Sequence, residues 1–119
     1  MAEPDGNDSG FRSEYRLSKT DEFSSVFAFR KALRGIHFDM LHRPNSAATA
    51  RLGVVIGKKF VRSAVKRNLV RRIVRESFRQ LRPQLPARDL VVRVRSRVVV
   101  VDRGAVRDEL SVLFGRLGG

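Results

Sequence analysis

Hydrophobic and polar residues recur with periods that change along the chain, and each change predicts a new element. Phe23, Val26 and Phe27 lie at helical spacing behind Ser18 and Thr20, which are both plausible N-cap residues, and this predicts a helix over about residues 20–33. Acidic residues in the first turn of this segment suit the positive end of a helix dipole. The chain therefore opens its folded part with a short amphipathic helix.

Two short strands are predicted after this helix. Gly35 is expected to end the helix, and residues 36–40 then alternate between apolar and polar side chains, as in a half-buried strand. A second apolar run covers residues 52–56, and the segment 44–50 between the two runs has the Pro, Asn and Ser residues of turns. We interpret the two strands as a hairpin.

A long helix is predicted from about Val61, and its two sides differ in chemistry. At 100° per residue, one side is apolar and carries Leu69, Val70, Ile73, Val74, Ser77 and Leu81. The other side, within an arc of about 100°, carries Asn68, Arg71, Arg72, Arg75, Arg79 and Arg82. Pro83 and Pro86 are expected to stop the helix.

The last part of the chain predicts a strand and a helix. Residues 89–95 have the apolar and β-branched character of a strand, and Asp102 is a good N-cap for a helix with apolar residues at helical spacing. The order helix, strand, strand, helix, strand, helix predicts a single small α+β domain over residues 15–119, with one sheet flanked by helices. The polar residues 1–14 are predicted to be a disordered N-terminal extension without the pattern of a secretory signal.

Composition narrows the possible partners of this domain. The 119 residues have a formal net charge of +13, which calls for an acidic partner, and nucleic acid fits best. An anionic membrane is the competing partner, but the chain has no Trp anchor and no apolar run of membrane-spanning length. The absence of cysteine excludes disulfides and thiol chemistry, and it fits a cytoplasmic protein.

The long helix carries the strongest functional signal. Between Lys58 and Arg82 the chain has ten Lys or Arg residues and one acid, Glu76. Like charges four residues apart destabilise a helix by about 0.2–0.5 kcal/mol per pair, and a solvated face usually avoids them by mixing charge signs. The pairs formed by Arg67, Arg71 and Arg75 break this rule, which favours a phosphate-binding role over a merely solvated face.

Other candidate chemistry is sparse. Phe23 and Phe27, one turn apart and followed by Arg30 and Lys31, can be core residues or a stacking platform for unpaired bases. His37 and His42 lack a positioned acid-base partner, and the carboxylates form no recurring cluster of the kind that holds catalytic metal ions. The sequence therefore favours a binding protein over a nuclease that works alone.

The motifs around the long helix resemble the bacterial ribonuclease P protein component. The similarity rests on residues 51–59 (RLGVVIGKK), residues 64–72 (AVKRNLVRR) and residues 75–79 (RESFR), and it extends over roughly residues 17–117. The family motif usually reads Arg-Asn-Arg, whereas this chain has Leu69 in the third position. Because Leu69 falls on the apolar side of the predicted helix, we expect its effect to be limited to one RNA contact.

The resemblance implies a fold, an activity and partners. It implies a sheet of about four strands flanked by helices, with a left-handed strand-helix-strand crossover at the basic helix, whereas the general rule favours the right-handed form. It implies a subunit that assembles, one protein per RNA, with a catalytic RNA to form an endoribonuclease that removes the 5′ leader of precursor tRNA. The magnesium ions would be held mainly by the RNA subunit and substrate, so no catalytic residue is expected in the protein.

The resemblance also assigns residues to two RNAs. Contacts with the catalytic RNA are expected from Lys58, Lys59, Arg62, Arg67, Asn68, Arg71, Arg72 and Arg75. Contacts with the single-stranded leader are expected from Phe23, Phe27, Arg30, Lys31 and Arg51, and Phe38 is the candidate for an aromatic contact from the neighbouring strand. A ribosomal or chaperone-like RNA binder and a protein-only nuclease are the alternative functions.

Overall fold

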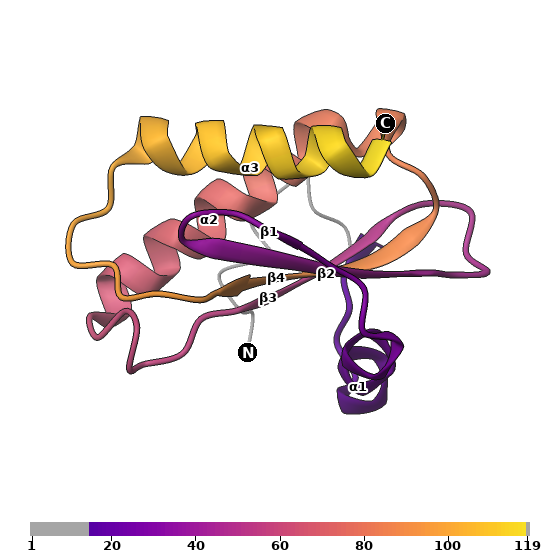
Figure 1. Cartoon of the computed structure of the whole chain (residues 1–119), viewed down its shortest axis with the longest axis horizontal. Coiled ribbons are helices and arrows are strands. Elements are labelled where there is room, and N and C mark those ends of the chain that lie inside the picture. Colours follow the sequence, from indigo (N-terminus) through magenta and orange to yellow (C-terminus); the bar gives the residue numbers. More distant parts are fainter. Residues whose placement is uncertain (1–14, 119) are drawn as a thin grey trace, which may run out of the picture.

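The computed structural model describes residues 15–118, so the disordered extension predicted for residues 1–14 lies outside the described residues. The described part is a single α+β domain, as predicted, with helices on a four-stranded sheet (Figure 1). Its elements are α1 (Thr20–Phe29), β1 (Ala32–Arg34), β2 (Phe38–Pro44), β3 (Arg51–Val55), α2 (Ala64–Leu81), the 3-10 helix η3 (Arg82–Gln84), β4 (Arg88–Val94) and α3 (Arg103–Gly118).

The strand order corrects the predicted hairpin. The sheet has the order β1-β2-β4-β3, in which β4 pairs antiparallel with β2 and parallel with β3. β4 occupies the centre because its run Leu90, Val91 and Val92 is apolar on both faces, and both faces of this strand are covered. β2 and β3 are therefore neighbours of β4 and do not pair with each other.

The first helix is shorter than the predicted span of 20–33. Arg30 adopts a left-handed conformation (φ 62°), and its N–H donates to the Phe27 carbonyl, which ends α1. The following residues turn back and pair with β2 as β1, which the apolar pattern alone does not indicate. Gly35 lies in the β1–β2 turn, where its N–H donates to the Phe38 carbonyl over 2.7 Å, and it does not end the helix.

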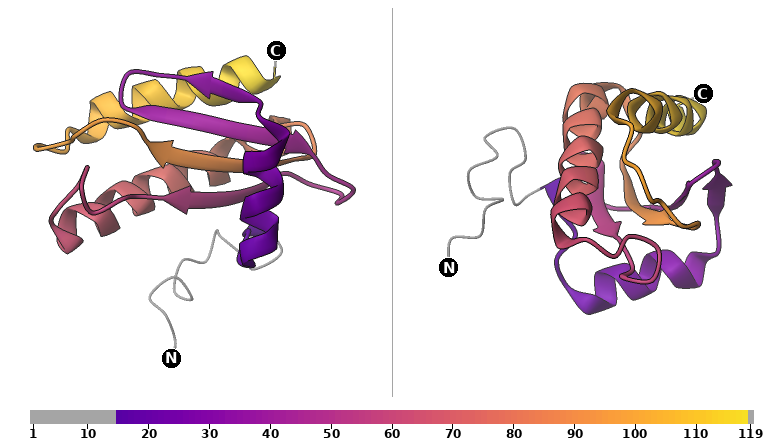
Figure 2. Two further views of the ribbon diagram at one scale, coloured as in Figure 1. Left: turned by 60° about the horizontal axis from the view of Figure 1, so that its bottom comes forward. Right: turned by 90° about the vertical axis from the view of Figure 1, so that its left-hand side faces the viewer.

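Each face of the sheet is covered by different helices. α2 and α3 pack on one face, whereas α1 crosses the other (Figures 1 and 2). Alternation along β4 divides its side chains accordingly: Leu90, Val92 and Val94 join the large core under α2 and α3, and Val91 joins the small core under α1. On the α1 face, the side chains beyond the helix stay accessible and form an open surface: Val55 and Arg93 are partly buried and Arg95 is exposed.

The basic helix forms where the sequence predicts it. Ser63 caps α2 by accepting a hydrogen bond from the Lys66 N–H over 3.2 Å. Its buried stripe contains Val70, Ile73, Val74, Ser77 and Phe78, so the predicted apolar side is confirmed except that Leu69 and Leu81 are only partly buried. α2 connects the parallel strands β3 and β4, and the left-handed sense of this crossover stays an expectation from the resemblance.

Candidate nucleic-acid interface

Phe23 anchors α1 to the sheet. A Cβ placed on Gly53 of β3 would lie 2.4 Å from Cε1 of the Phe23 ring, so the ring rests on bare backbone. Leu17, Val26, Leu41 and Val91 complete this small core, and Phe23 and Phe27 pack against it partly buried. Phe23 thus has a structural role.

Phe27 and Arg93 meet where α1 leaves the sheet uncovered. The Arg93 guanidinium carbon lies 5.8 Å from the centre of the Phe27 ring. Arg93 also donates to Asp39 Oδ2 over 3.1 Å, and Arg95 Nε lies 3.6 Å from Asp39 Oδ1. Asp39 is 4% exposed, so a buried carboxylate holds two arginines, and one of them, Arg93, lies over the partly buried ring of Phe27. A ring beside fixed cations is the arrangement that stacks and neutralises a nucleotide.

The sequence reasoning did not assign Arg93, Arg95 or Asp39 to the site. The two-residue period of β4 is the sequence pattern that could have identified the two arginines, because Arg93 and Arg95 replace apolar residues on the face that carries Val91. The pairing that brings Asp39 opposite Arg93 depends on the sheet order, and the sequence did not reveal that order.

Arg51, expected to contact the leader, is held in a network within the protein. Its Nε and Nη2 donate to the two carboxylate oxygens of Asp89 over 2.9 Å each, and its Nη1 donates to Glu22 over 3.1 Å. The hydrogen bonds that Arg51 donates to Asp89 are the main cause that raises the pKa of Arg51 above its usual value. Backbone N–H groups of Lys19 and Ser18, with Arg51, lower the pKa of Glu22. Arg51 therefore ties α1 to β3 and β4.

The other expected leader contacts differ in position. Arg30 and Lys31 are exposed just after α1, as a cationic contact with RNA requires. Phe38 is 1% exposed and belongs to the core beneath α2 and α3, on the opposite face from Phe27. The expectation that Phe38 supplies an aromatic leader contact is therefore wrong, because alternation along β2 turns its ring away from α1.

The expected contacts with the catalytic RNA lie along α2 and the loop before it. Five are exposed: Lys58, Lys59, Arg62, Asn68 and Arg72. Arg71 donates to Asn68 Oδ1 over 3.2 Å, and Arg71 and Arg75 are partly buried. Among these exposed cations, Lys58, Lys59 and Arg62 lie in the loop before α2, and Arg72 lies on the helix itself.

Arg67 differs from its neighbours. Its Nη1 donates to the carbonyls of Val61 and Arg62 over 3.0 and 2.9 Å, which closes the loop before α2 onto the helix. Lys66 likewise donates to the Val99 carbonyl. These two cations stabilise the start of α2, and Arg67 presents only the rest of its guanidinium to a ligand.

Acid-base groups are scattered over the domain. In the described range 15–118, no group of three or more His, Asp or Glu side chains could hold a metal ion. Arg88 Nη1 lies 3.3 Å from His42 Nδ1 and donates to it, since a guanidinium has no acceptor. Burial, followed by the charges of Arg88 and Lys31, lowers the pKa of His42. The same range contains no helix long and apolar enough to cross a membrane.

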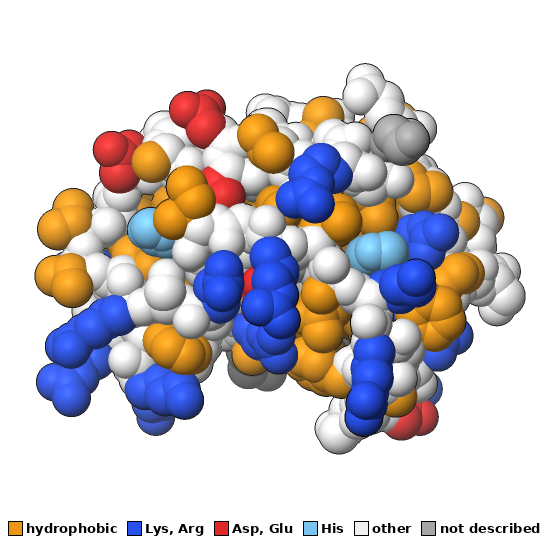
Figure 3. Space-filling view, in the orientation of Figure 1, with side chains coloured by type: hydrophobic (Ala, Val, Ile, Leu, Met, Phe, Trp, Pro, Cys, Tyr) orange, Lys and Arg blue, Asp and Glu red, His pale blue; other side chains and the backbone are white. Residues whose placement is uncertain are grey.

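Charge divides the surface into regions. Lys and Arg side chains spread over the lower part of the face shown in Figure 3, whereas Asp and Glu gather mainly along its upper edge, over α3. Together with the exposed cations of α2 and of the loop before it, this distribution is that of a nucleic-acid-binding protein with a single α+β domain.

Comparisons with known proteins give the family. A family model described as Ribonuclease P matches residues 11–118. The chain is 55% identical over 117 residues to the ribonuclease P protein component of Azoarcus sp., with 98% of each chain covered. It is 51% identical over 116 residues to that of Aromatoleum aromaticum, again with 98% of each covered. The chain belongs to the family of bacterial ribonuclease P protein components, and it is the protein subunit of the endoribonuclease that matures the 5′ end of tRNA.

Solved structures agree with this assignment. The ribonuclease P protein of Thermotoga maritima superposes with a TM-score of 0.76 at 35% identity, covering 87% of this chain and 98% of that chain. The Staphylococcus aureus protein superposes with a TM-score of 0.80 at 22% identity, covering 88% and 98%, and supports the fold alone.

Proposed function

We propose that the protein uses two separate surfaces to hold two RNAs. The exposed cations of α2 and of residues 58–62 dock on the catalytic RNA, and the open sheet surface beside α1 holds the single-stranded leader of precursor tRNA. The observation that carries this proposal is the position of α1 and α2 on opposite faces of one sheet. Two RNAs can therefore be bound at the same time without competing for the same side chains.

The leader surface is proposed from the chemistry around Phe27. Phe27 offers a partly exposed ring, Arg93 lies over that ring, and Arg30 and Lys31 follow at the end of α1. Stacking of a base on an aromatic ring tolerates any sequence and contributes about 1–3 kcal/mol per base. A leader varies between tRNA precursors, so recognition by stacking and charge suits it better than base-specific hydrogen bonds.

The docking surface is proposed from the charges of α2. Arg72 and Asn68 are exposed together, and Lys58, Lys59 and Arg62 extend the same charge along the preceding loop. Arginine binds phosphate in a bidentate manner, and release of condensed counterions adds to the affinity. Leu69, which replaces the usual arginine, is partly buried on the other side of α2, so it leaves these contacts in place.

Magnesium and location follow from the partners. As the resemblance implies, we assign Mg²⁺ mainly to the RNA subunit and the substrate, and we derive no step of the protein through it. The protein would lower the magnesium requirement by neutralising phosphates near the cleavage site. We place the cleavage of precursor tRNA in the cytoplasm, because precursor tRNA is made there. We expect one protein per RNA subunit, as the resemblance implies.

Reconstitution tests the proposal. The protein, the ribonuclease P RNA of the same cell and a precursor tRNA with a labelled leader are combined at low magnesium, and release of the leader is measured with each component omitted in turn. Cleavage is expected only with the RNA, and it should be strongly stimulated by the protein. Cleavage by the protein alone would contradict the division of labour, and RNA binding without stimulation would indicate a general RNA chaperone.

A further inference from the structure

The α1 face of the sheet carries two neighbouring rows of residues that differ in chemistry. Residues paired directly across strands share a face, so the register defines each row. The first row has no charge and lies under α1: Ala32, Leu41, Val91 and Gly53. The second row is two residues further along each strand: Arg34, Asp39, Arg93 and Val55. Beyond the helix, an acid therefore lies between two arginines.

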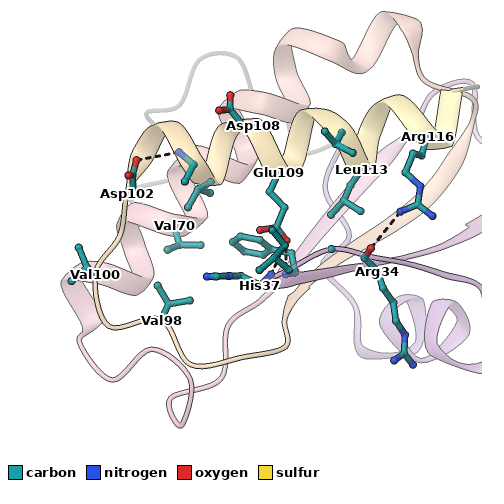
Figure 4. Close-up of a pocket in the computed structure, with 16 residues that line it drawn as sticks. Arg34, His37, Val70, Val98, Val100, Asp102, Asp108, Glu109, Leu113 and Arg116 are labelled. Atoms are coloured by element: carbon teal, nitrogen blue, oxygen red, sulfur yellow. Dashed lines mark hydrogen bonds between the residues drawn. The ribbon is translucent and has the colours of Figure 1, made fainter.

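Asp39 is a buried charge at the centre of the second row. Its Oδ2 accepts from Arg93 over 3.1 Å, whereas its Oδ1 is buried without a hydrogen bond from residues 15–118. Arg34 lies opposite Asp39 on β1, and its side chain points away from α3 (Figure 4). Removing a carboxylate from water costs free energy that nearby cations offset. The arginines therefore stabilise Asp39, and Asp39 in turn restricts their positions.

Arg95 is held by the turn between β1 and β2. Its Nη1 donates to the Gly35 carbonyl over 2.9 Å, and its backbone N–H donates to the His37 carbonyl over 2.8 Å. Glu109 of α3 holds the same turn from the other side of the sheet (Figure 4). It accepts at Oε2 from the N–H groups of His37 and Phe38, over 2.8 and 2.9 Å. These contacts fix Arg95 and the start of β2, the strand that carries the buried acid.

Arg93 is the arginine that this arrangement directs toward an aromatic ring. Its guanidinium carbon lies 5.8 Å from the centre of the Phe27 ring, and its side chain is 41% exposed. An arginine in solution populates many rotamers, so fixing it before a ligand arrives reduces the entropy lost on binding. Without the carboxylate, the like charges of Arg34 and Arg95 would favour other rotamers of Arg93. The buried acid thus keeps the cation beside the ring.

We propose that Asp39 is a positioning residue of the leader surface: it holds Arg93 beside Phe27, so that an unpaired base stacks on the ring while the guanidinium binds an adjoining phosphate. This role rests on the proposed leader surface, and Asp39 itself contacts no RNA there. Two kinds of binding respond to the acid with opposite sign. Its negative charge weakens general attraction to phosphate, but its hold on Arg93 improves the fit of a nucleotide. Asp39 therefore lowers affinity for any polyanion and raises discrimination for an unpaired leader.

Asp39→Asn tests this role, because it removes the charge and nearly keeps the shape. In the holoenzyme reconstituted with its RNA subunit, the ratio of precursor to mature tRNA affinities should fall about 2- to 5-fold, the contribution of one exposed cation–π contact. The full chain alone should bind polyphosphate, which has phosphates and no bases, at least as tightly as before. Asp108→Asn is the matched control: it makes the same charge change at an exposed residue of α3 and should leave the ratio unchanged.

A double-mutant cycle identifies the residue through which Asp39 acts. In an Arg93→Gln background, Asp39→Asn should not lower the ratio further, because the cation that it positions is already gone. Circular dichroism and Tm confirm that each variant folds. If Asp39→Asn unfolds, Asp39→Thr replaces it in the cycle, since a β-branched residue suits a strand.

Three results would overturn the role of Asp39. They are an unchanged ratio in a folded variant, losses that add to those of Arg93→Gln, and a parallel loss of polyphosphate binding, which would indicate only structural damage. If Phe27→Leu and Arg93→Gln also leave the ratio unchanged, the leader surface itself is wrong. A ratio that responds to those two changes and not to Asp39→Asn leaves the leader surface in place and removes only the positioning role.

Discussion

The ring of Phe23 occupies the space that a side chain on Gly53 would need, with 2.4 Å between Cε1 and the position of the missing Cβ. This close contact places α1 against the sheet and so sets the position of Phe27 beside the open surface. The sequence alone leaves two roles open for these rings, core packing and base stacking. In the structure Phe23 packs on the sheet, and we propose that Phe27 stacks on bases.

Gly53→Ala is expected to displace Phe23 and lower the free energy of unfolding by about 1–3 kcal/mol, a usual cost of overpacking. Urea denaturation measures this change. Phe23→Leu removes the ring edge, so the double variant Gly53→Ala/Phe23→Leu should lose less stability than the sum of the two single changes. Additive losses would mean that the two residues do not share this space.

Phe27→Leu should weaken binding of precursor tRNA about 5- to 150-fold, because stacking contributes about 1–3 kcal/mol per base. Binding of mature tRNA, which has no leader, should change little, and the ratio of the two affinities is the measurement. Arg93→Gln is expected to act in the same direction. Equal losses for both tRNAs would return Phe27 to a purely structural role.

Asp89→Ala should destabilise the fold by roughly 3 kcal/mol or more, because the guanidinium of Arg51 loses the buried carboxylate that accepts two of its hydrogen bonds. Asp89 is 3% exposed and also accepts from Asn45 Nδ2 over 2.8 Å. Arg51→Ala should likewise lower Tm. Its effect on leader affinity should be indirect, through the displacement of α1 from the sheet. A large loss of leader affinity with unchanged Tm would show that Arg51 contacts the leader directly.

Arg72→Ala and Arg67→Ala should separate RNA docking from stability. Arg72 is exposed, so its replacement should weaken assembly with the catalytic RNA and reduce the salt dependence by about one phosphate contact, with Tm unchanged. Arg67→Ala should also lower Tm, because two loop carbonyls lose their donor. Arg107→Ala, an exposed change on α3, serves as the control for nonspecific charge loss and should affect neither property.

Stability should fall as the pH drops through about 6.5, because of His42. Burial and the nearby cations Arg88 and Lys31 lower its pKa from 6.5, so the unfolded chain takes up the proton first and is favoured. The free energy of unfolding measured between pH 5 and 8 should therefore rise with pH, and His42→Gln should flatten that rise. An NMR titration that finds the pKa of His42 above 6.5 would contradict the prediction.

Elements with a long, clean period were predictable from the sequence, whereas pairings were not. The stripe from Val70 to Ser77 repeats at helical spacing over several turns, and Asp102 caps α3 as expected. The hairpin assigned to residues 36–40 and 52–56 was wrong because adjacency in sequence was taken for adjacency in the sheet. β4, which is apolar on both faces and distant in sequence, lies between β2 and β3 and keeps them from pairing with each other. No local sequence pattern indicates which strands will pair.

The candidate site shows the same limit. The basic side of α2 follows from one helical period, and the structure exposes Asn68, Arg72 and Arg79 on it, whereas Arg71, Arg75 and Arg82 are partly buried. Asp39 and Arg93, by contrast, come together only through the pairing of β2 with β4. The sequence assigns Arg51 to an RNA contact. In the structure, however, the parallel pairing of β3 and β4 brings Asp89 next to Arg51, and the two side chains bind each other.

The central position of β4 sets the order in which the chain can complete its fold. While the ribosome makes the chain, β2 and β3 emerge long before the strand that must lie between them. α2 emerges with its arginines before the complete sheet exists to support it. Since Leu52 pairs with Leu90, the closing contacts are distant in sequence, and such contacts slow folding. A chain stopped before Arg88 should therefore behave as an unfolded cationic polymer, and only completion of β4 converts its charge into a defined surface.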